Sequence, residues 1–286
     1  ACSRPANSFW PMAESARRCR PLLGTLVEIE AQSCAIDAGF DAIAQVHASM
    51  SFHSQESDLA RLRRAACGSR VEVAPATIEV LRIALDLYAA TDGLFDVTCA
   101  NRLVADGFLP ASDGVDPRCA TGTSIDIEID DATHLRCHRA LLIDLGGIAK
   151  GYAVDCAVTA LIEAGAQEGI VNAGGDLRVF GKHSRLVHAR GDDGALVAAF
   201  EAREVAIASS DNRRSRDDRR GRTPTPHIGH RGQPVVTDEC IVVAAGRCVI
   251  ADAFTKIAMA DRAMARRLIG RYGGWLPDLV AIERAA

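Results

Sequence analysis

The amino-acid sequence predicts an α+β fold built on an antiparallel sheet. Strand patterns come in runs, and the clearest run covers residues 177–180, 186–190, 196–200 and 204–208. Helical patterns lie between such runs in separate blocks, whereas a parallel α/β fold would alternate single strands with single helices. The order of the elements therefore favours helices packed against antiparallel strands.

Apolar spacing and turn residues predict the other elements. The first helix is the clearest, because Phe40, Ile43, Val46 and Met50 share one of its faces. In chain order, the patterns predict a strand at 24–31, helices at 36–50, 58–64 and 75–90, a loop at 106–124, strands at 125–129 and 140–143, a helix after residue 150 that Gly165 ends, and a helical run at 254–268.

Length and composition indicate a globular protein with a sizeable core. The chain has 286 residues, of which 48% are hydrophobic and 24% charged. We expect one domain over residues 20–286, built as a single unit or as two intimate subdomains, and a poorly ordered segment at 1–19. The net charge of -4 argues against nucleic acid and membrane surfaces as partners. The apolar run at 241–250 is interrupted by Arg247, so no membrane span is expected.

The ten cysteines do not indicate a metal centre. They are spread along the chain without Cys-x-x-Cys spacing and without nearby histidine pairs. Zinc and iron–sulfur sites need such groupings, so neither is expected. Disulfide pairing cannot be assigned from this spacing.

Two Gly-rich turns beside a lysine indicate phosphate binding. The segment 144–151 reads Asp-Leu-Gly-Gly-Ile-Ala-Lys-Gly between a predicted strand and a predicted helix, and 172–176 reads Asn-Ala-Gly-Gly-Asp. Backbone N–H groups at a helix start are unpaired and attract anions, and Lys150 adds a full charge. Tight turns and close packing are the alternative reason for such glycines. The spacing matches neither the Walker pattern nor the dinucleotide fingerprint.

These turns and four other segments resemble the FAD:protein FMN transferases, the ApbE-type flavin transferases. The resemblance covers about residues 20–265 and keeps the order of the family's motifs. The segments that carry it are 144–151 with 172–176, Arg20-Pro-Leu-Leu-Gly-Thr25, Met50 to Leu62, Thr91-Asp-Gly-Leu-Phe-Asp-Val-Thr98, and Ala251-Asp-Ala-Phe-Thr-Lys256.

The resemblance implies a two-layer, T-fold-like architecture of duplicated antiparallel sheets under helices. It also implies a reaction: a threonine or serine hydroxyl of an acceptor protein attacks the FMN phosphorus of FAD, and AMP leaves, with Mg²⁺ as the metal. Relatives are often exported, which favours the periplasm. The chain shows no leader after Ala1, so an export signal is absent or removed, and a cytoplasmic location is the alternative.

The resemblance also implies site residues. Lys150 and His227 are the catalytic candidates, His227 as general base for the incoming hydroxyl. The magnesium ligands would be the carbonyl of Ala149, the carboxylate of Asp252 and the hydroxyl of Thr255. The FAD-binding candidates are Leu23, Gly24, His53, Glu56, Asp96, Gly146, Gly147, Lys150, Asn172, Gly174, Gly175 and Asp176.

The chain departs from the family pattern at the metal site. Threonine commonly follows the aspartate by four residues, but this position holds Lys256, and Thr255 comes three residues after Asp252. The two offsets differ by about 100° around a helix, so Thr255 reaches the ion only through a shifted turn or a water. Alternatively, Lys256 supplies the charge itself. Asp252 has a second reading, as a helix N-cap.

Other candidates have structural alternatives too. A turn role competes for Asp176, and capping or turn roles compete for Glu56, Asp96 and Thr98. His53 stands where the family has a tyrosine that stacks on a ring, and a partly buried structural histidine is the alternative.

The segment 211–222 carries six arginines and departs from any familiar motif. It reads as a solvated loop, or as a surface for phosphate or an acidic partner. After it, Gly229-His-Arg231 stands where an Asp-Pro pair is expected beyond His227-Ile228. Two other functions therefore stay open, an FAD pyrophosphatase and a non-catalytic flavin-binding protein.

Overall fold

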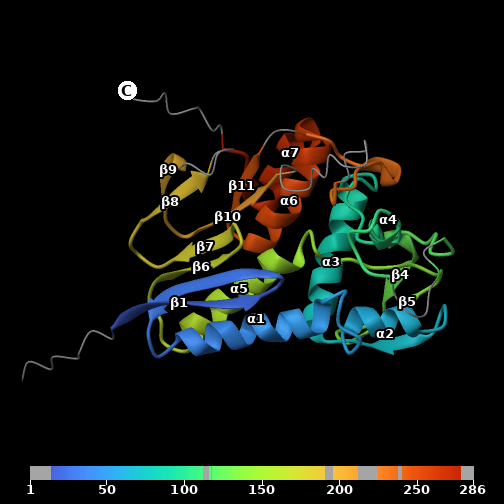
Figure 1. The fold of residues 1–286 in the computed structure, drawn as a ribbon, viewed down its shortest axis with the longest axis horizontal. Coiled ribbons are helices and arrows are strands. Elements are labelled where there is room, and N and C mark those ends of the chain that lie inside the picture. The colour runs from blue at the N-terminus through green and yellow to red at the C-terminus, as the bar shows by residue number, and fades with distance from the viewer. Residues whose placement is uncertain are drawn as a thin grey trace, which may run out of the picture.

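The computed structural model describes residues 14–111, 116, 118–190, 196–211, 225–237 and 240–277. Its centre is a seven-stranded antiparallel sheet with the strand order β1-β2-β6-β7-β10-β11-β12 (Figure 1). The strands are β1 (Ser15–Leu22), β2 (Thr25–Gln32), β6 (Gly169–Ala173), β7 (Asp176–Phe180), β10 (Val205–Ser210), β11 (Ile241–Ala245) and β12 (Gly274–Trp275). The predicted α+β class, with antiparallel sheets under helices, is confirmed.

Three helices cover one face of this sheet, namely α1 (Ile36–Met50), α5 (Ala149–Glu163) and α6 (Cys248–Ala260). Close packing of α1 depends on Gly39. A Cβ at Gly39 would lie 2.9 Å from Ile29 Cδ1 and 3.1 Å from Leu161 Cγ, so a larger residue would push α1 away from β2 and α5. The helices and the sheet therefore share one tightly packed apolar core.

A hairpin covers part of the opposite face. It consists of β8 (Arg185–Arg190) and β9 (Leu196–Ala202). Val187 and Ala202 of this hairpin form a second apolar cluster with Leu177, Ile207 and Val242 of the main sheet. The central strands β7, β10 and β11 are thus buried on both faces.

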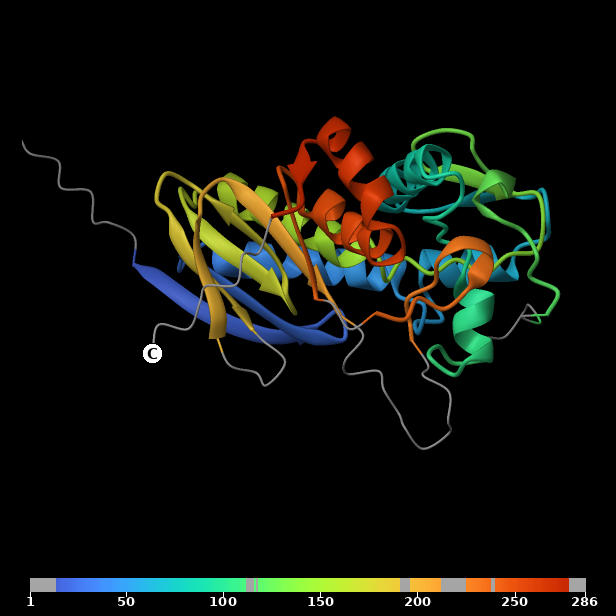
Figure 2. The same cartoon turned by 90° about the horizontal axis from the view of Figure 1, so that it is seen from above.

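The other end of the molecule holds α2 (Asp58–Arg64), α3 (Pro75–Ala90), α4 (Ala100–Ala105) and a small sheet of β3 (Arg70–Glu72), β5 (His134–Cys137) and β4 (Ile127–Ile129). Figures 1 and 2 show this part and the main sheet at opposite ends of the long axis. Helix α7 (Arg262–Leu268) follows α6, and 3₁₀ turns lie at Ser124–Asp126, His230–Gly232 and Ile269–Tyr272. In the described part of the chain, no helix is both long and apolar enough to cross a membrane.

Three expectations about elements are corrected by the structure. Residues 140–143 form no strand, since their only ladder contact is a single parallel bridge from Leu142 to Cys99, although Leu141, Leu142 and Ile143 are buried. The run at 254–268 is two helices, because Asp261 is extended between them and its carboxylate caps α7 through Met264 N–H at 2.9 Å.

The third correction concerns the N-terminal boundary. Residues 15–19, which were expected to be poorly ordered, belong to β1, and this strand pairs with β2 along its whole length. Residues 1–13 lie outside the described part of the chain. The folded domain therefore begins at least five residues earlier than the predicted start at residue 20.

Candidate functional site

A cavity of about 1160 Å³ lies between the two parts of the molecule, at the ends of β2, β6, β7 and β10. All five segments that carry the family resemblance contribute to its walls, although they are far apart in sequence. Their lining residues include Leu23 and Gly24, Met50 to His53, Leu94 to Val97, Asp144 to Gly147 with Ala149 and Lys150, Asn172 with Gly174 and Gly175, and Lys256. Pockets of such size hold nucleotide-sized ligands.

Two tight hairpin turns form one side of the cavity. Gly174 and Gly175 connect β6 to β7 with φ angles of 68° and 105°, and Leu23 and Gly24 connect β1 to β2 with φ angles of 56° and 70°. Two consecutive residues with positive φ are the mark of the turns that suit the twist of a hairpin. The turn reading of the second Gly-rich segment is therefore correct, and the same glycines line the cavity.

The first Gly-rich segment leads into α5, as predicted, but two of its backbone N–H groups already donate hydrogen bonds within the protein. Gly146 N–H donates to Asp144 Oδ1 at 3.1 Å, and Gly151 N–H donates to Asp252 Oδ2 at 3.0 Å. In this structure these two N–H groups bind carboxylates of the protein itself. The N-cap residue Ile148 offers no side-chain acceptor, and Ala149 N–H donates to the carbonyl oxygen of Leu145 at 2.8 Å, so Asp252 is the side chain that caps this first turn. Ala149 and Lys150, at the start of α5, line the cavity.

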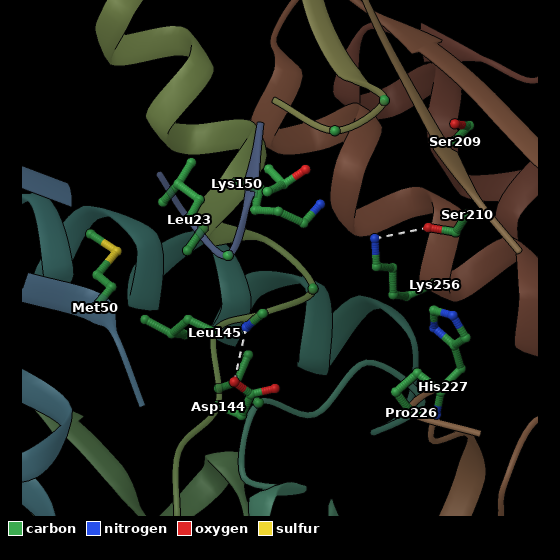
Figure 3. A pocket seen from close by; sticks show the side chains of 18 of the residues that line it. Leu23, Met50, Asp144, Leu145, Lys150, Ser209, Ser210, Pro226, His227 and Lys256 are labelled. Carbon is green, nitrogen blue, oxygen red and sulfur yellow. Dashed lines mark hydrogen bonds between the residues drawn. The ribbon is translucent and has the colours of Figure 1, made fainter. Parts of the chain in front are cut away.

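Four charged side chains meet at the base of the cavity. Lys150 Nζ, from α5, donates to Asp176 Oδ2 of β7, and Lys256 Nζ donates to Asp252 Oδ1 at 2.5 Å within α6. Both carboxylates are buried and do not line the cavity, whereas both lysines do. Figure 3 shows the two ammonium groups on neighbouring walls. The base of the cavity therefore presents two ammonium groups that are backed by two buried carboxylates.

The pKa values follow this arrangement. Burial lowers the pKa of Lys150, but Asp252 and Asp176 outweigh burial, so the pKa is raised and Lys150 is charged. Burial raises the pKa of Asp252, but Lys150 and Lys256 outweigh it and hold the pKa below its usual value. The pKa of Asp176 is raised by burial and by Asp252. Asp252 is thus the carboxylate that both lysines stabilise most.

Lys256 occupies the position between the predicted metal-binding side chains. Its ammonium is 2.5 Å from Asp252 Oδ1, 3.0 Å from Thr255 Oγ1 and 3.0 Å from Ser210 Oγ (Figure 3 shows the last contact). Thr255 is fully buried, and its hydroxyl also donates to Asp252 O at 2.7 Å. Asp252 lies in the second turn of α6, which begins at Cys248, so its reading as an N-cap is wrong.

The start of α6 is held by a residue that the sequence did not single out. Asp155 of α5 accepts from Cys248 N–H at 2.9 Å and from Val249 N–H at 3.0 Å, and it also accepts from Arg178 Nη1 at 2.7 Å. It thereby caps α6 from a neighbouring helix, because Arg247 at the N-cap position makes no side-chain bond to the helix. Asp155 positions the helix that carries Lys256.

His227 lines the cavity next to Lys256 (Figure 3). Its Nε2 lies 3.3 Å from the carbonyl oxygen of Asp211, which can only accept, so in the neutral ring the proton is on Nε2 and the lone pair is on Nδ1. Burial and the charge of Lys256 lower its pKa to about 4. His227 is therefore neutral at pH 7 and can accept a proton at Nδ1, but it is a weak base.

Three other predicted FAD-binding residues, Asn172, His53 and Asp96, line the cavity. Asn172 lines the cavity and its side chain accepts from Gly175 N–H at 3.0 Å, which fixes the turn. His53 is exposed and lines the cavity, so its reading as a partly buried structural residue is wrong. Asp96 also lines the cavity, and its Oδ1 accepts hydrogen bonds from the hydroxyls of Thr98 and Ser124.

Glu56 is exposed and does not line the cavity, so the structure gives it no contact with a ligand there. Residues that sequence reasoning missed do line it, including Asp144 by its side chain, Ser209 and Ser210. Residues 212–222 of the Arg-rich segment lie outside the described part of the chain.

Comparison with known proteins agrees with this arrangement. A family model described as the ApbE family matches residues 23–273. The chain belongs to the ApbE family. An FAD:protein FMN transferase of Rhodobacter capsulatus is 31% identical over 178 residues, and one of Vibrio cholerae is 26% identical over 196 residues. These matches cover 57% and 63% of this chain, but only 34% and 57% of those proteins, so the chain spans about a third to somewhat over half of the relatives' length.

Solved ApbE structures share the fold. An ApbE protein of Thermotoga maritima has a TM-score of 0.79 at 22% identity, with 91% of this chain and 93% of that chain covered. The flavinyl transferase ApbE of Pseudomonas stutzeri, in its apo form, has a TM-score of 0.74 at 21% identity, with 89% and 88% covered. At these identities the likeness establishes the architecture of an ApbE protein and no more.

Proposed function

We propose that this protein is an FAD:protein FMN transferase. The observation that carries the proposal is the convergence of all five motif segments on one cavity, which is lined by Lys150, Lys256 and the first residues of α5. A dinucleotide with a diphosphate group suits such a cavity, because apolar walls receive the rings and the two lysines receive the phosphates.

The proposed reaction transfers one phosphoryl group. The hydroxyl oxygen of a threonine or serine in an acceptor protein forms a bond to the FMN phosphorus of FAD. The bond from that phosphorus to the oxygen bridging the two phosphates breaks, and AMP leaves with this oxygen. The hydroxyl proton passes to a base. No oxidation or reduction occurs, so the enzyme supplies positioning and charge.

The residues divide these tasks. Lys150, held by Asp176, neutralises the diphosphate from the side of α5. The turns at Leu23-Gly24 and Gly174-Gly175 shape the wall along which the ligand lies. His227 is neutral and stands in the same cavity, where Nδ1 can accept the hydroxyl proton. Its low pKa means that it returns this proton readily to water or to the leaving phosphate.

The side chains at the predicted metal site do not fit Mg²⁺ in this arrangement. The oxygens of Asp252 accept from Gly151 N–H and from Lys256, and the hydroxyl of Thr255 is bonded to Ser210, to Asp252 O and to Lys256. A Mg²⁺ ion needs free oxygen lone pairs in octahedral positions at about 2.0 to 2.1 Å. The proposed reaction therefore contains no step through a metal.

An assay of AMP formation tests the proposal. The purified protein is incubated with FAD, with and without a threonine-containing acceptor domain, and AMP and covalently bound flavin are both measured. Release of AMP only with acceptor, in equal amount to the bound flavin, is the expected result. AMP without acceptor would make the protein an FAD pyrophosphatase, and FAD binding without AMP would make it a flavin-binding protein.

A further inference from the structure

We propose that the ammonium group of Lys256 takes the place of a divalent cation, so that this protein binds FAD and transfers FMN without a metal at the Asp252 site. The inference rests on the proposed function for its chemistry, but its geometric basis is independent of it. It assigns Lys256 as a charge-supplying residue of the cavity wall.

The first observation is the match between donors and acceptors around Lys256 Nζ. An ammonium group has three N–H donors. Three oxygens surround it, from Asp252 at 2.5 Å, Ser210 at 3.0 Å and Thr255 at 3.0 Å. These oxygens come from two elements, the end of β10 and the middle of α6. They form a small oxygen cage of the kind that holds a hard cation, and the cation in it is Lys256.

The second observation is that both carboxylate oxygens of Asp252 already accept a hydrogen bond from the protein, Oδ1 from Lys256 and Oδ2 from Gly151 N–H. Asp252 Oδ2 is engaged by Gly151 N–H, which fixes the carboxylate against α5. Asp252 is fully buried, so water does not reach it from another side. A divalent ion would have to displace the ammonium from all three oxygens and then lie beside it, and like charges at such short distance repel strongly.

The third observation is that the neighbouring Gly-rich segment leaves space for the lysine stem. A Cβ at Gly147 would lie 3.3 Å from Lys256 Cγ, closer than most such contacts, and at an ordinary 3.6 Å from Lys256 Cε. A residue with a side chain at 147 would therefore press on the stem. The chain contains only three lysines, Lys150, Lys182 and Lys256, and two of them line this cavity.

Lys256 would act on the ligand as a fixed positive charge. Its side chain is about one-fifth exposed, towards the cavity, and the three protein oxygens hold it in place. As the bond to the bridging oxygen breaks, negative charge grows on the AMP phosphate. An ammonium that is already oriented stabilises this charge without reorganisation. Lys150 does the same from the wall formed by α5.

The test compares FAD binding and AMP release with and without divalent ions. The intact protein is freed of metal with EDTA, and the FAD dissociation constant is measured by flavin fluorescence in EDTA and in Mg²⁺. For the wild type we expect the two constants to agree within about twofold, and AMP release with acceptor to persist in EDTA. A tenfold or larger requirement for Mg²⁺ in either measurement would overturn the inference.

Two variants test whether the ammonium group of Lys256 is responsible for FAD binding in EDTA. Lys256→Thr removes the ammonium and supplies a hydroxyl, so FAD affinity in EDTA should fall by roughly tenfold or more, the usual order for a lost charged contact, and Mg²⁺ should restore it. Lys182→Ala is the matched control, since Lys182 is exposed and lies away from the cavity, and it should behave as the wild type. Unchanged FAD affinity of Lys256→Thr in EDTA would contradict the inference.

The two proposals fail in different ways. If no AMP forms in any buffer while FAD binds equally in EDTA and Mg²⁺, the transferase function is wrong and the role of Lys256 stands. If AMP forms with acceptor only when Mg²⁺ is present, the function stands and the role of Lys256 is wrong. Should Lys256→Thr fail to fold, the wild-type comparison decides alone.

Discussion

Asp155→Ala should lower the free energy of unfolding far more than the substitution of an exposed aspartate on a helix would. The carboxylate is buried and accepts from two buried backbone amides, Cys248 N–H and Val249 N–H, and from Arg178. Alanine would leave these amides without acceptors and would remove the only side-chain cap that the described residues give to α6. The variant therefore combines a lost cap with a broken buried ion pair.

The expected loss of stability is about 3 to 5 kcal/mol. A lost helix cap costs about 1 kcal/mol, and leaving one partner of a buried ion pair costs about 3 to 5 kcal/mol. The contributions overlap in one carboxylate, so they do not add in full. Because Arg178 keeps a quarter of its side chain in water, we expect the lower half of the range. For a chain of this size, the melting temperature should fall by roughly 10 °C.

Urea unfolding followed by circular dichroism measures this loss. Asp37→Ala is the control, because Asp37 pairs with Arg18 and Arg20 but its side chain is 59% exposed, and such surface pairs contribute about 0 to 1 kcal/mol. Asp155→Asn should lie between the two, since one oxygen remains to accept an amide. A loss below about 1 kcal/mol for Asp155→Ala would refute the view that Asp155 holds α6 in place.

Further predictions concern the turns and His227. Gly174→Ala should destabilise by about 2 kcal/mol or more, because φ is 68° and a Cβ would lie 2.4 Å from Thr25 Oγ1, and urea midpoints measure it. Leu23→Gly should instead stabilise by about 1 kcal/mol in the same assay, since a leucine at φ 56° is strained, while FAD affinity falls with the lost apolar wall. His227 has a pKa of about 4 in the folded protein, below the ordinary 6.5, because the folded state favours the neutral ring. Its contribution to the free energy of unfolding is therefore complete above pH 6.5 and is lost as the pH falls to 4. At pH 5 the loss is about 2 kcal/mol, and His227→Gln should be correspondingly less sensitive to pH between 5 and 7.5. Equal pH sensitivity of both proteins would contradict the lowered pKa.

The helices were predictable because their apolar residues recur at helical spacing and so lie on one face. The helix at 36–50 has the predicted bounds, and so does the one at 75–90, where Pro75 at the first position marks the start. Strand β11 was missed for the opposite reason. All five residues of Ile241–Ala245 are buried, so the segment has no alternation of apolar and polar residues. Strand β1 was missed because it is an exposed edge strand rich in arginine.

The site was predictable where neighbours in sequence form it, and not where partners are distant. The Gly-rich turns, Lys150 and His53, which their motifs single out, all line the cavity. The contacts of Asp155 with α6 span 93 and 94 residues, and Ser210 meets Lys256 across 46 residues. A single sequence contains no local signal for such pairs. Only the fold brings the end of β10 beside α6.

The charges at the base of the cavity explain what a lysine at position 256 changes. Lys150 and Lys256 balance Asp176 and Asp252, so the formal charge of the four side chains is zero before any ligand binds. With a divalent ion in place of the ammonium, Lys150 would still balance one of the two buried carboxylates, but the other would depend on an ion from solution, and the empty site would carry one uncompensated negative charge. Lys256 removes this dependence, because its charge is covalently part of α6. The arrangement provides one positive charge fewer than a divalent ion would, so in the proposed reaction the growing charge on AMP would be stabilised less strongly. If the proposed transfer takes place here, we expect a preorganised site that needs no ion but supports slower phosphoryl transfer than the same cavity would around Mg²⁺.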